Sequence, residues 1–202
     1  MRNTRTLTRA VPAALAPIAL TMTLAGCGGA LSDTGKSDGA APSGSPDDRK
    51  TFRLGESSPQ QGSLEKDGKG ATYTVTPTKV VTGTSEDVNK SGLDKSQLKG
   101  PRVPVHVWST LTHTGGKPMP IRAMDGGLVI RTDRGDRTKA LLVMWGDVTW
   151  PDCPKPDPEK KLAKGTVEKI CTTFLITRGE KPAAVELEQG FHREPLEWPV
   201  ED

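Results

Sequence analysis

Three cysteines and three histidines carry most of the chemistry that this sequence offers, and two of the cysteines form a candidate pair. An even number of cysteines in an exported domain predicts a disulfide, so Cys153 and Cys171 are expected to be bridged. The alternative is a metal or redox pair, but the sequence has no C-x-x-C motif and no histidine close to either cysteine. The bridge would close a loop of about 19 residues, which stabilises a fold by roughly 3 kcal/mol in the chain-entropy model.

The remaining cysteine, Cys27, stands at the end of an export signal. A basic start with three arginines precedes an apolar run over residues 10–24 that contains two prolines. This run is shorter than the ~20 residues of a spanning helix. The next residues, LAGC, resemble the bacterial lipobox, in which a peptidase cuts before the cysteine and the thiol carries a diacylglyceryl group. The resemblance implies a signal peptide over 1–26 and lipidation of Cys27, and two acyl chains make a durable anchor. An ordinary secretory signal is the alternative.

Composition divides the rest of the chain into a tether and a domain. Residues 27–50 are rich in Gly, Ser, Asp and Pro, with Leu31 as the one large apolar residue, so we expect a flexible tether. Residues 51–202 are long enough for one domain with one core. The chain has 28 basic and 25 acidic residues, and removing the three signal arginines leaves 25 of each. With no basic block, we expect no nucleic acid partner.

Short runs of alternating apolar and polar residues predict an all-β domain. The strongest run, 102–112, places Val105 and Val107 on one face and His106 and Trp108 on the other. We also expect a single helical turn over 93–98 and irregular structure over the proline-rich 151–158. About seven strands with frequent turns favour an antiparallel sandwich. The other expected strands span 73–81, 121–124, 127–132, 139–145 (buried on both faces), 167–177, 184–187 and 196–200.

Four stretches carry a resemblance to a known family: YTVTPTKVV, PVHVWSTLTHTGGKPMPI, GTVEKICTTFLITRGEKPAAVEL and PLEWPV. In order and spacing they resemble secreted bacterial immunoglobulin-like domains, often found on lipoproteins, of the DUF4352 and MPT63 immunoprotective extracellular type. The resemblance covers most of residues 70–200. It implies an immunoglobulin-like β-sandwich outside the cytoplasm, and it offers no catalytic residues.

Exposed tryptophans can stack on a sugar ring or anchor a protein partner. Trp108 lies opposite the valine face of its strand and Trp150 precedes Pro151, so both are candidate ligand-binding residues. Trp145 lies in an apolar run and is expected in the core. Trp198 is expected to close one end of the sandwich.

Two other classes of function stay open. A copper-handling lipoprotein would use His113, Met119 and Met124, because imidazole and thioether ligands suit Cu(I). The sequence lacks the His-x-Met spacing of exported copper chaperones.

A hydrolase would need a nucleophile with a base, or two carboxylates such as Asp125 and Asp147. There is no G-x-S-x-G motif, and His106 or His113 are the available bases. The Arg-Gly-Asp tripeptide at 134–136 falls in an expected turn, where Gly and Asp are favoured for backbone reasons alone.

These observations favour a binding lipoprotein without catalytic activity or cofactor, anchored at the extracytoplasmic face of the cell membrane. Its expected partners are the membrane, through the diacylglyceryl group on Cys27, and an envelope component or protein. We expect a monomer.

Overall fold

The computed structural model describes residues 49–201 except 65, 144–147 and 158. The signal peptide, Cys27, all but the last residues of the tether and Trp145 lie outside the described residues, so these predictions stay untested. None of the described helices is long and apolar enough to cross a membrane.

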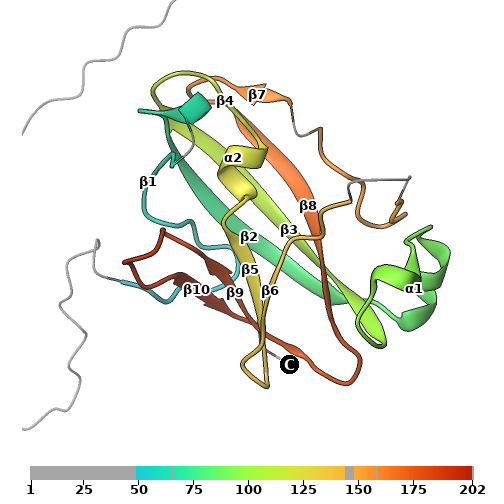
Figure 1. Cartoon of the computed structure of the whole chain (residues 1–202). Coiled ribbons are helices and arrows are strands. Elements are labelled where there is room, and N and C mark those ends of the chain that lie inside the picture. The colour runs from blue at the N-terminus through green and yellow to red at the C-terminus, as the bar shows by residue number, and fades with distance from the viewer. Residues whose placement is uncertain (1–48, 65, 144–147, 158, 202) are drawn as a thin grey trace, which may run out of the picture. The chain divides into compact units, whose positions relative to one another are not determined.

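Long antiparallel pairings build the first sheet (Figure 1). Its order is β1-β2-β3-β8, with both neighbours of β3 antiparallel to it. Pro77, which has no N–H to donate, lies at a register shift in β2. The strands are β1 (Gln61–Gly62), β2 (Thr72–Thr82), β3 (Arg102–Gly115) and β8 (Val167–Thr177).

The second sheet has the order β10-β9-β5-β6 and is also antiparallel. A third pairing joins two short strands, β4 and β7. The strands of these two sheets are β4 (Met119–Pro120), β5 (Leu128–Thr132), β6 (Arg137–Lys139), β7 (Lys161–Leu162), β9 (Pro182–Leu187) and β10 (Leu196–Pro199). The short helices are η1 (Lys66–Gly68), α1 (Ser85–Lys90), η2 (Lys95–Gln97) and α2 (Arg122–Asp125).

The strand order confirms the immunoglobulin-like sandwich. An immunoglobulin fold places its first, second and fifth strands in one sheet and its third, sixth and seventh in the other. Here β2, β3 and β8 take the first set of places, and β5, β9 and β10 take the second, with β6 added beside β5. The disulfide departs from that pattern, because it lies outside the sandwich and does not join the two sheets.

The core lies between the two sheets because alternate residues of each strand face inward. Trp198 is fully buried there, against Phe52 at 5.4 Å between ring centroids, and its Nε1 donates to the carbonyl of Glu56. Other fully buried core residues are Val75, Val105, Val107, Leu111, Leu128, Ile130, Phe174, Ile176 and Val185.

Two expected strands are wrong. Residues 122–124 belong to α2 instead, with Ile121 directly before it, and Met124 donates its N–H to the carbonyl of Ile121 and packs into the core. The expected strand over 139–145 ends at Lys139. Beyond it, Ala140 bridges to Phe174 and Leu141 donates to the carbonyl of Thr173, so the chain leaves one sheet for the other. Its apolar residues therefore do not share one buried strand, and Leu142 is 87% exposed.

Candidate functional site

A second, smaller apolar cluster covers the outer face of the first sheet. We call it the outer cluster. It is separate from the core, and α1 and the segment 148–153 contribute to it together with β3 and β8. Its buried members are Val88, Trp150, Cys153, Cys171 and Leu175, with Leu93, Leu98, Trp108, Leu141 and Val148 packed against them.

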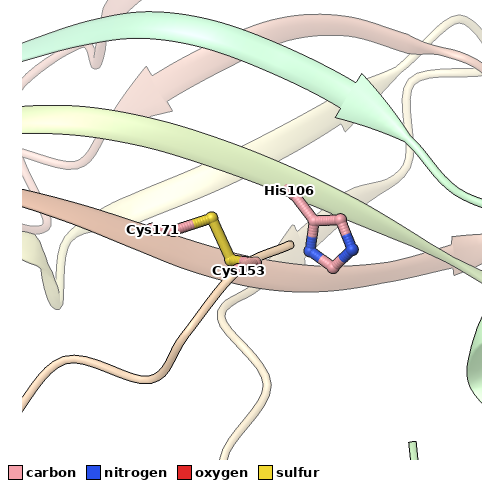
Figure 2. Close-up of side chains that lie close together, drawn as sticks. All are labelled: His106, Cys153 and Cys171. Carbon is pink, nitrogen blue, oxygen red and sulfur yellow. A yellow bond between two sulfur atoms is a disulfide. The ribbon is translucent and has the colours of Figure 1, made fainter. Parts of the chain in front are cut away.

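The disulfide between Cys153 and Cys171, which the cysteine count predicts, lies in this cluster (Figure 2). Cys171 stands on β8, in register with Trp108 of β3, while Cys153 belongs to the proline-rich segment. The bridge spans 18 residues, and the two Cα atoms are 5.2 Å apart. It therefore fastens an otherwise irregular segment to the outer face of the sheet.

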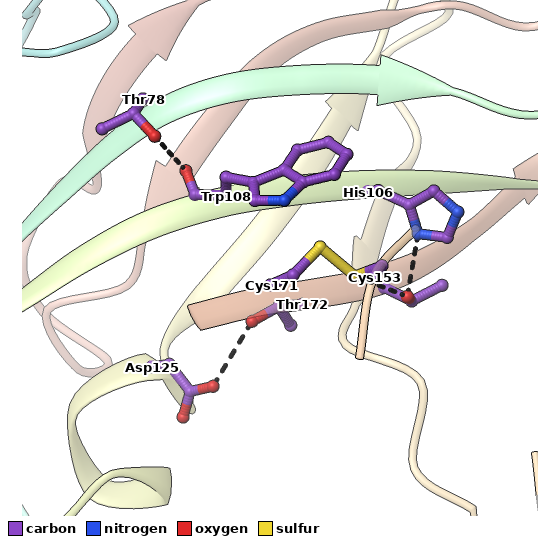
Figure 3. Close-up of a disulfide and its surroundings, with 8 residues drawn as sticks. Thr78, His106, Trp108, Asp125, Cys153, Cys171 and Thr172 are labelled. Atoms are coloured by element: carbon purple, nitrogen blue, oxygen red, sulfur yellow. Dashed lines mark hydrogen bonds between the residues drawn. A yellow bond between two sulfur atoms is a disulfide. The ribbon is translucent and has the colours of Figure 1, made fainter. Parts of the chain in front are cut away.

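His106 lies beside the disulfide, as Figures 2 and 3 show. Its side chain is almost buried, with its ring centroid 5.4 Å from that of Trp150 and 6.1 Å from that of Trp108. Burial lowers the pKa of the imidazole, although the charges of Asp87 and Asp152 oppose the shift.

A single hydroxyl links His106 to the disulfide. Thr173 Oγ1 lies 3.0 Å from His106 Nδ1 and 3.4 Å from Cys153 Sγ. A hydroxyl has one hydrogen, so when it is donated to the sulfur, Nδ1 must carry the ring proton and donate to the hydroxyl oxygen. Nε2 then keeps its lone pair.

Sequence spacing alone did not reveal this cluster. One ring nitrogen of His106 and the two sulfurs lie within 4.8 Å of one another. His106 is 47 residues before Cys153, but the register sets it opposite Thr173, two positions from Cys171. Only the pairing of β3 with β8 brings it there. In the disulfide the sulfurs are bonded to each other and offer no thiolate.

The two candidate ligand-binding tryptophans differ in their exposure. Trp150 is 8% exposed, because it packs over His106 inside the outer cluster, so it presents no surface for stacking. Trp108 is partly buried, with Lys79 Nζ 4.8 Å from its ring centroid and Thr78 donating to its carbonyl (Figure 3). The expectation of an exposed ring is therefore wrong for Trp150, and Trp108 stays a partly buried candidate.

The residues proposed for copper are all in the interior. His113, Met119 and Met124 are fully buried, and His113 Nε2 lies 2.8 Å from the carbonyl of Lys117. A carbonyl only accepts, so Nε2 carries the proton in that bond. In that tautomer Nε2 has no lone pair for a metal, and Met119 and Met124 pack in the core.

The carboxylate pair suggested for a hydrolase stays untested, because only Asp125 lies within the described residues. Asp125 lies on α2, where it accepts from the hydroxyl of Thr172 at 3.4 Å (Figure 3). Asp147 lies outside the described residues. The Arg-Gly-Asp tripeptide occupies the β5–β6 turn, where Gly135 has a φ of 87° and donates to the carbonyl of Thr132. A positive φ favours glycine, which accounts for that residue without a ligand.

A depression beside α2 and β6 was not foreseen from the sequence. We call it the basic depression: its volume is about 550 Å³, and α2, β6 and the loop between β9 and β10 contribute to it. Four of its lining residues are cationic, namely Arg122, Arg137, Lys139 and Arg193, against the single acid Glu188.

Apolar side chains also line the basic depression. Phe191 is fully exposed at 103% and Leu64 is 77% exposed. Gly190 sits beside Leu64, since a Cβ placed on it would lie 3.8 Å from Leu64 Cδ1. Large apolar side chains exposed to water mark a surface where binding a partner would bury apolar area and lower the free energy.

No family model and no curated protein matches this sequence, so membership of the DUF4352 group stays a prediction. A solved structure of a secreted protein from Mycobacterium tuberculosis, MPT63, is similar at 15% identity, over 75% of this chain and 98% of that one. The TM-score is 0.48.

Proposed function

We propose that this protein is a lipid-anchored, extracytoplasmic binding protein without catalytic activity, and that it contacts its partner at the basic depression. The observation that carries the proposal is the exposure of Phe191 and Leu64 next to a set of cations. The anchor rests on the lipobox-like LAGC at residues 24–27.

Exposed apolar area supports binding here. Burying a side chain of this size stabilises a complex by about 2–3 kcal/mol, so leaving two in water is unfavourable unless they meet a partner. The outer cluster offers less, because Trp150 is already buried and Trp108 is partly covered by Lys79. The basic depression is therefore the better surface.

The charges indicate what kind of group is bound. Arg122 pairs with Glu159, Arg137 with Glu186 and Lys139 with Glu188. Arg193 has no ion pair among the described residues. A carboxylate or phosphate on the partner would therefore meet Arg193 directly, while an attached apolar group packs on Phe191. We propose an envelope component that carries both.

A cross-linking experiment on intact cells tests this proposal. A photoreactive amino acid is placed at Phe191 in one variant and at Leu142 in the other, since both side chains are exposed and only the first lines the basic depression. Adding Arg193→Glu to the Phe191 variant should abolish the product, because it reverses the charge that meets the anion.

The expected result is a discrete adduct at position 191 that is missing at 142 and lost with R193E. Equal labelling at both positions, or no adduct at 191, would overturn the proposal. Digestion of an adduct with a phosphatase, a protease or a lipase then tells which envelope molecule supplies the anion.

A further inference from the structure

We propose that reduction of the Cys153–Cys171 disulfide turns the outer cluster into a metal site, in which two thiolates and His106 bind one zinc-type ion. This inference goes beyond the proposed binding function and uses none of the residues of the basic depression.

The ligand atoms already lie close enough for a metal. The two sulfurs and a ring nitrogen of His106 are within 4.8 Å of one another, and all three residues are buried. Zinc binds thiolate sulfur at about 2.3 Å and imidazole nitrogen at about 2.0–2.1 Å, so its ligands stand roughly 3.5–3.8 Å apart. The nitrogen thus lies close to the distance that zinc ligands require, and the two sulfurs, which are bonded to each other in the disulfide, must separate.

The segment that carries Cys153 can allow that separation. It lies between Pro151 and Pro154 and outside every strand, and its backbone is held by the turn bond from Cys153 N to the carbonyl of Trp150. Cys171 and His106 stand on paired strands. One ligand on an irregular segment and two on paired strands suit a site that forms after the S–S bond breaks.

The third ligand also has a nitrogen on the side of the sulfurs. The nitrogen of His106 that faces the disulfide is Nδ1, which lies 3.0 Å from the Thr173 hydroxyl (Figure 3). To bind a metal through Nδ1, the ring must carry its proton on Nε2, and the hydroxyl must give up its bond to Nδ1. The hydroxyl already has a second partner in Cys153 Sγ at 3.4 Å, so it can turn to that sulfur. Two thiolates and an imidazole favour a soft or borderline ion, which fits zinc and excludes calcium or magnesium.

The reaction balances with an external dithiol as the reductant. Its two thiols donate two electrons and two protons to the protein disulfide, which becomes two cysteine thiols while the dithiol becomes a disulfide. Metal binding then displaces the two thiol protons. The bound ion would replace the disulfide as the cross-link between the 148–153 segment and β8.

The test uses the full exported domain, reduced with a small dithiol that is then removed without oxygen. Cobalt(II) replaces zinc as the probe, because the intensity of its thiolate-to-cobalt charge-transfer band reports the number of sulfur ligands. Tyrosine and tryptophan near-UV circular dichroism reports whether the reduced domain stays folded. His106→Ala removes the proposed ligand, and His192→Ala is the matched control on an exposed histidine.

We expect one cobalt per reduced chain with two thiolate ligands, displaced by zinc, and none for the oxidised chain. H106A should weaken cobalt binding at least tenfold and H192A should leave it unchanged. If reduction unfolds the domain, refolding on addition of zinc supports the proposal. No charge-transfer band, equal affinity for H106A and wild type, or a reduced chain that stays unfolded with zinc would each overturn it.

Discussion

The imidazole of His106 stands edge-on to the indole of Trp150, with ring centroids 5.4 Å apart and planes inclined by 65°. This contact joins β3 to a segment that has no strand of its own. With the disulfide beside it, this contact makes the outer cluster a second packed layer on the outer face of β3 and β8.

Replacing Trp150 with alanine should destabilise the domain by about 3 kcal/mol, because a buried indole is lost and the segment cannot close the space. Urea denaturation followed by circular dichroism measures the free energy of unfolding. The control is Leu142→Ala, at a side chain that is 87% exposed, where we expect a change within about 0.5 kcal/mol. Similar losses for the two variants would show that Trp150 does not hold the layer.

Removing the disulfide with the pair Cys153→Ser and Cys171→Ser should cost about 3 kcal/mol, since the bridge closes a loop of 18 residues in the unfolded chain. Combined with W150A, the loss should be smaller than the sum, because both changes release the same segment. A double-mutant cycle in urea measures this. Strict additivity would mean that the disulfide and Trp150 hold different parts of the domain.

Stability should fall as the pH drops below about 6.5, with the disulfide intact. Burial makes the pKa of His106 lower in the folded state than in the unfolded chain, so the unfolded chain binds the proton first. The loss begins at the unfolded pKa of about 6.5 and continues down to the folded pKa. Unfolding free energies of wild type and His106→Gln between pH 8 and pH 5 measure it, and the variant should lose this slope.

A separate acid step belongs to Asp87. The Thr84 backbone N–H, and after it the Thr84 hydroxyl, bond to its carboxylate and lower its pKa below 3.8. A carboxylate whose pKa is lowered by folding stabilises the fold above its unfolded pKa, and this stabilisation is lost as the pH falls below that value. The loss of stability due to Asp87 therefore occurs below about pH 4. Asp87 does not titrate in the folding equilibrium between pH 8 and pH 5. If the free energy of unfolding of H106Q falls over that range as steeply as that of the wild type, the role of His106 is contradicted.

How far the sequence predicts this fold depends on whether a residue's partner is near it in the chain. The long strands β2, β3 and β8 follow from alternation alone, and on β8 the alternate residues Ile170, Phe174 and Ile176 face the core. The helix α1 was not expected, although Thr84 and Asp87 cap each other three residues apart and are a local signal for its start.

The outer cluster shows why the remaining contacts could not be predicted from the sequence. Trp150 has the pattern of a loop residue before proline, and nothing nearby in the sequence indicates that this loop folds back over β3. The same holds for His106, whose neighbours across the sheet are fixed by the register of β3 with β8. The basic depression likewise joins residues from 64 to 195, so its cations have no common spacing.

Replacing Cys27 with serine should release the protein from the membrane into the culture medium, because serine has no thiol to carry the diacylglyceryl group. Fractionation of cells and medium with an antibody to the domain measures this, and mass spectrometry of the mature N-terminus identifies the lipid on the wild type. The matched control is C153S/C171S, which keeps the lipobox-like residues and should stay in the membrane fraction. Release of wild-type protein with an unmodified start would refute the anchor.

Glu186 should be the most costly carboxylate to remove from the second sheet. Its side chain is 5% exposed and accepts from Arg131 Nε at 2.9 Å and Arg137 Nε at 2.7 Å, while Arg131 also pairs with Glu197. Hydrogen bonds to charged groups contribute about 1.5–3 kcal/mol, and the partial exposure of both arginines lowers that range. We expect Glu186→Gln to cost about 1–2 kcal/mol.

The exposed pair of Glu86 and Lys90 supplies the comparison, since both side chains are 70% exposed and four residues apart on α1. Glu86→Gln should cost much less than E186Q, and raising the salt concentration should remove that small effect while leaving most of the E186Q loss in place. Urea denaturation at low and high sodium chloride measures both. If salt removes the two losses alike, the Glu186 network is a surface interaction and does not stabilise the sheet from within.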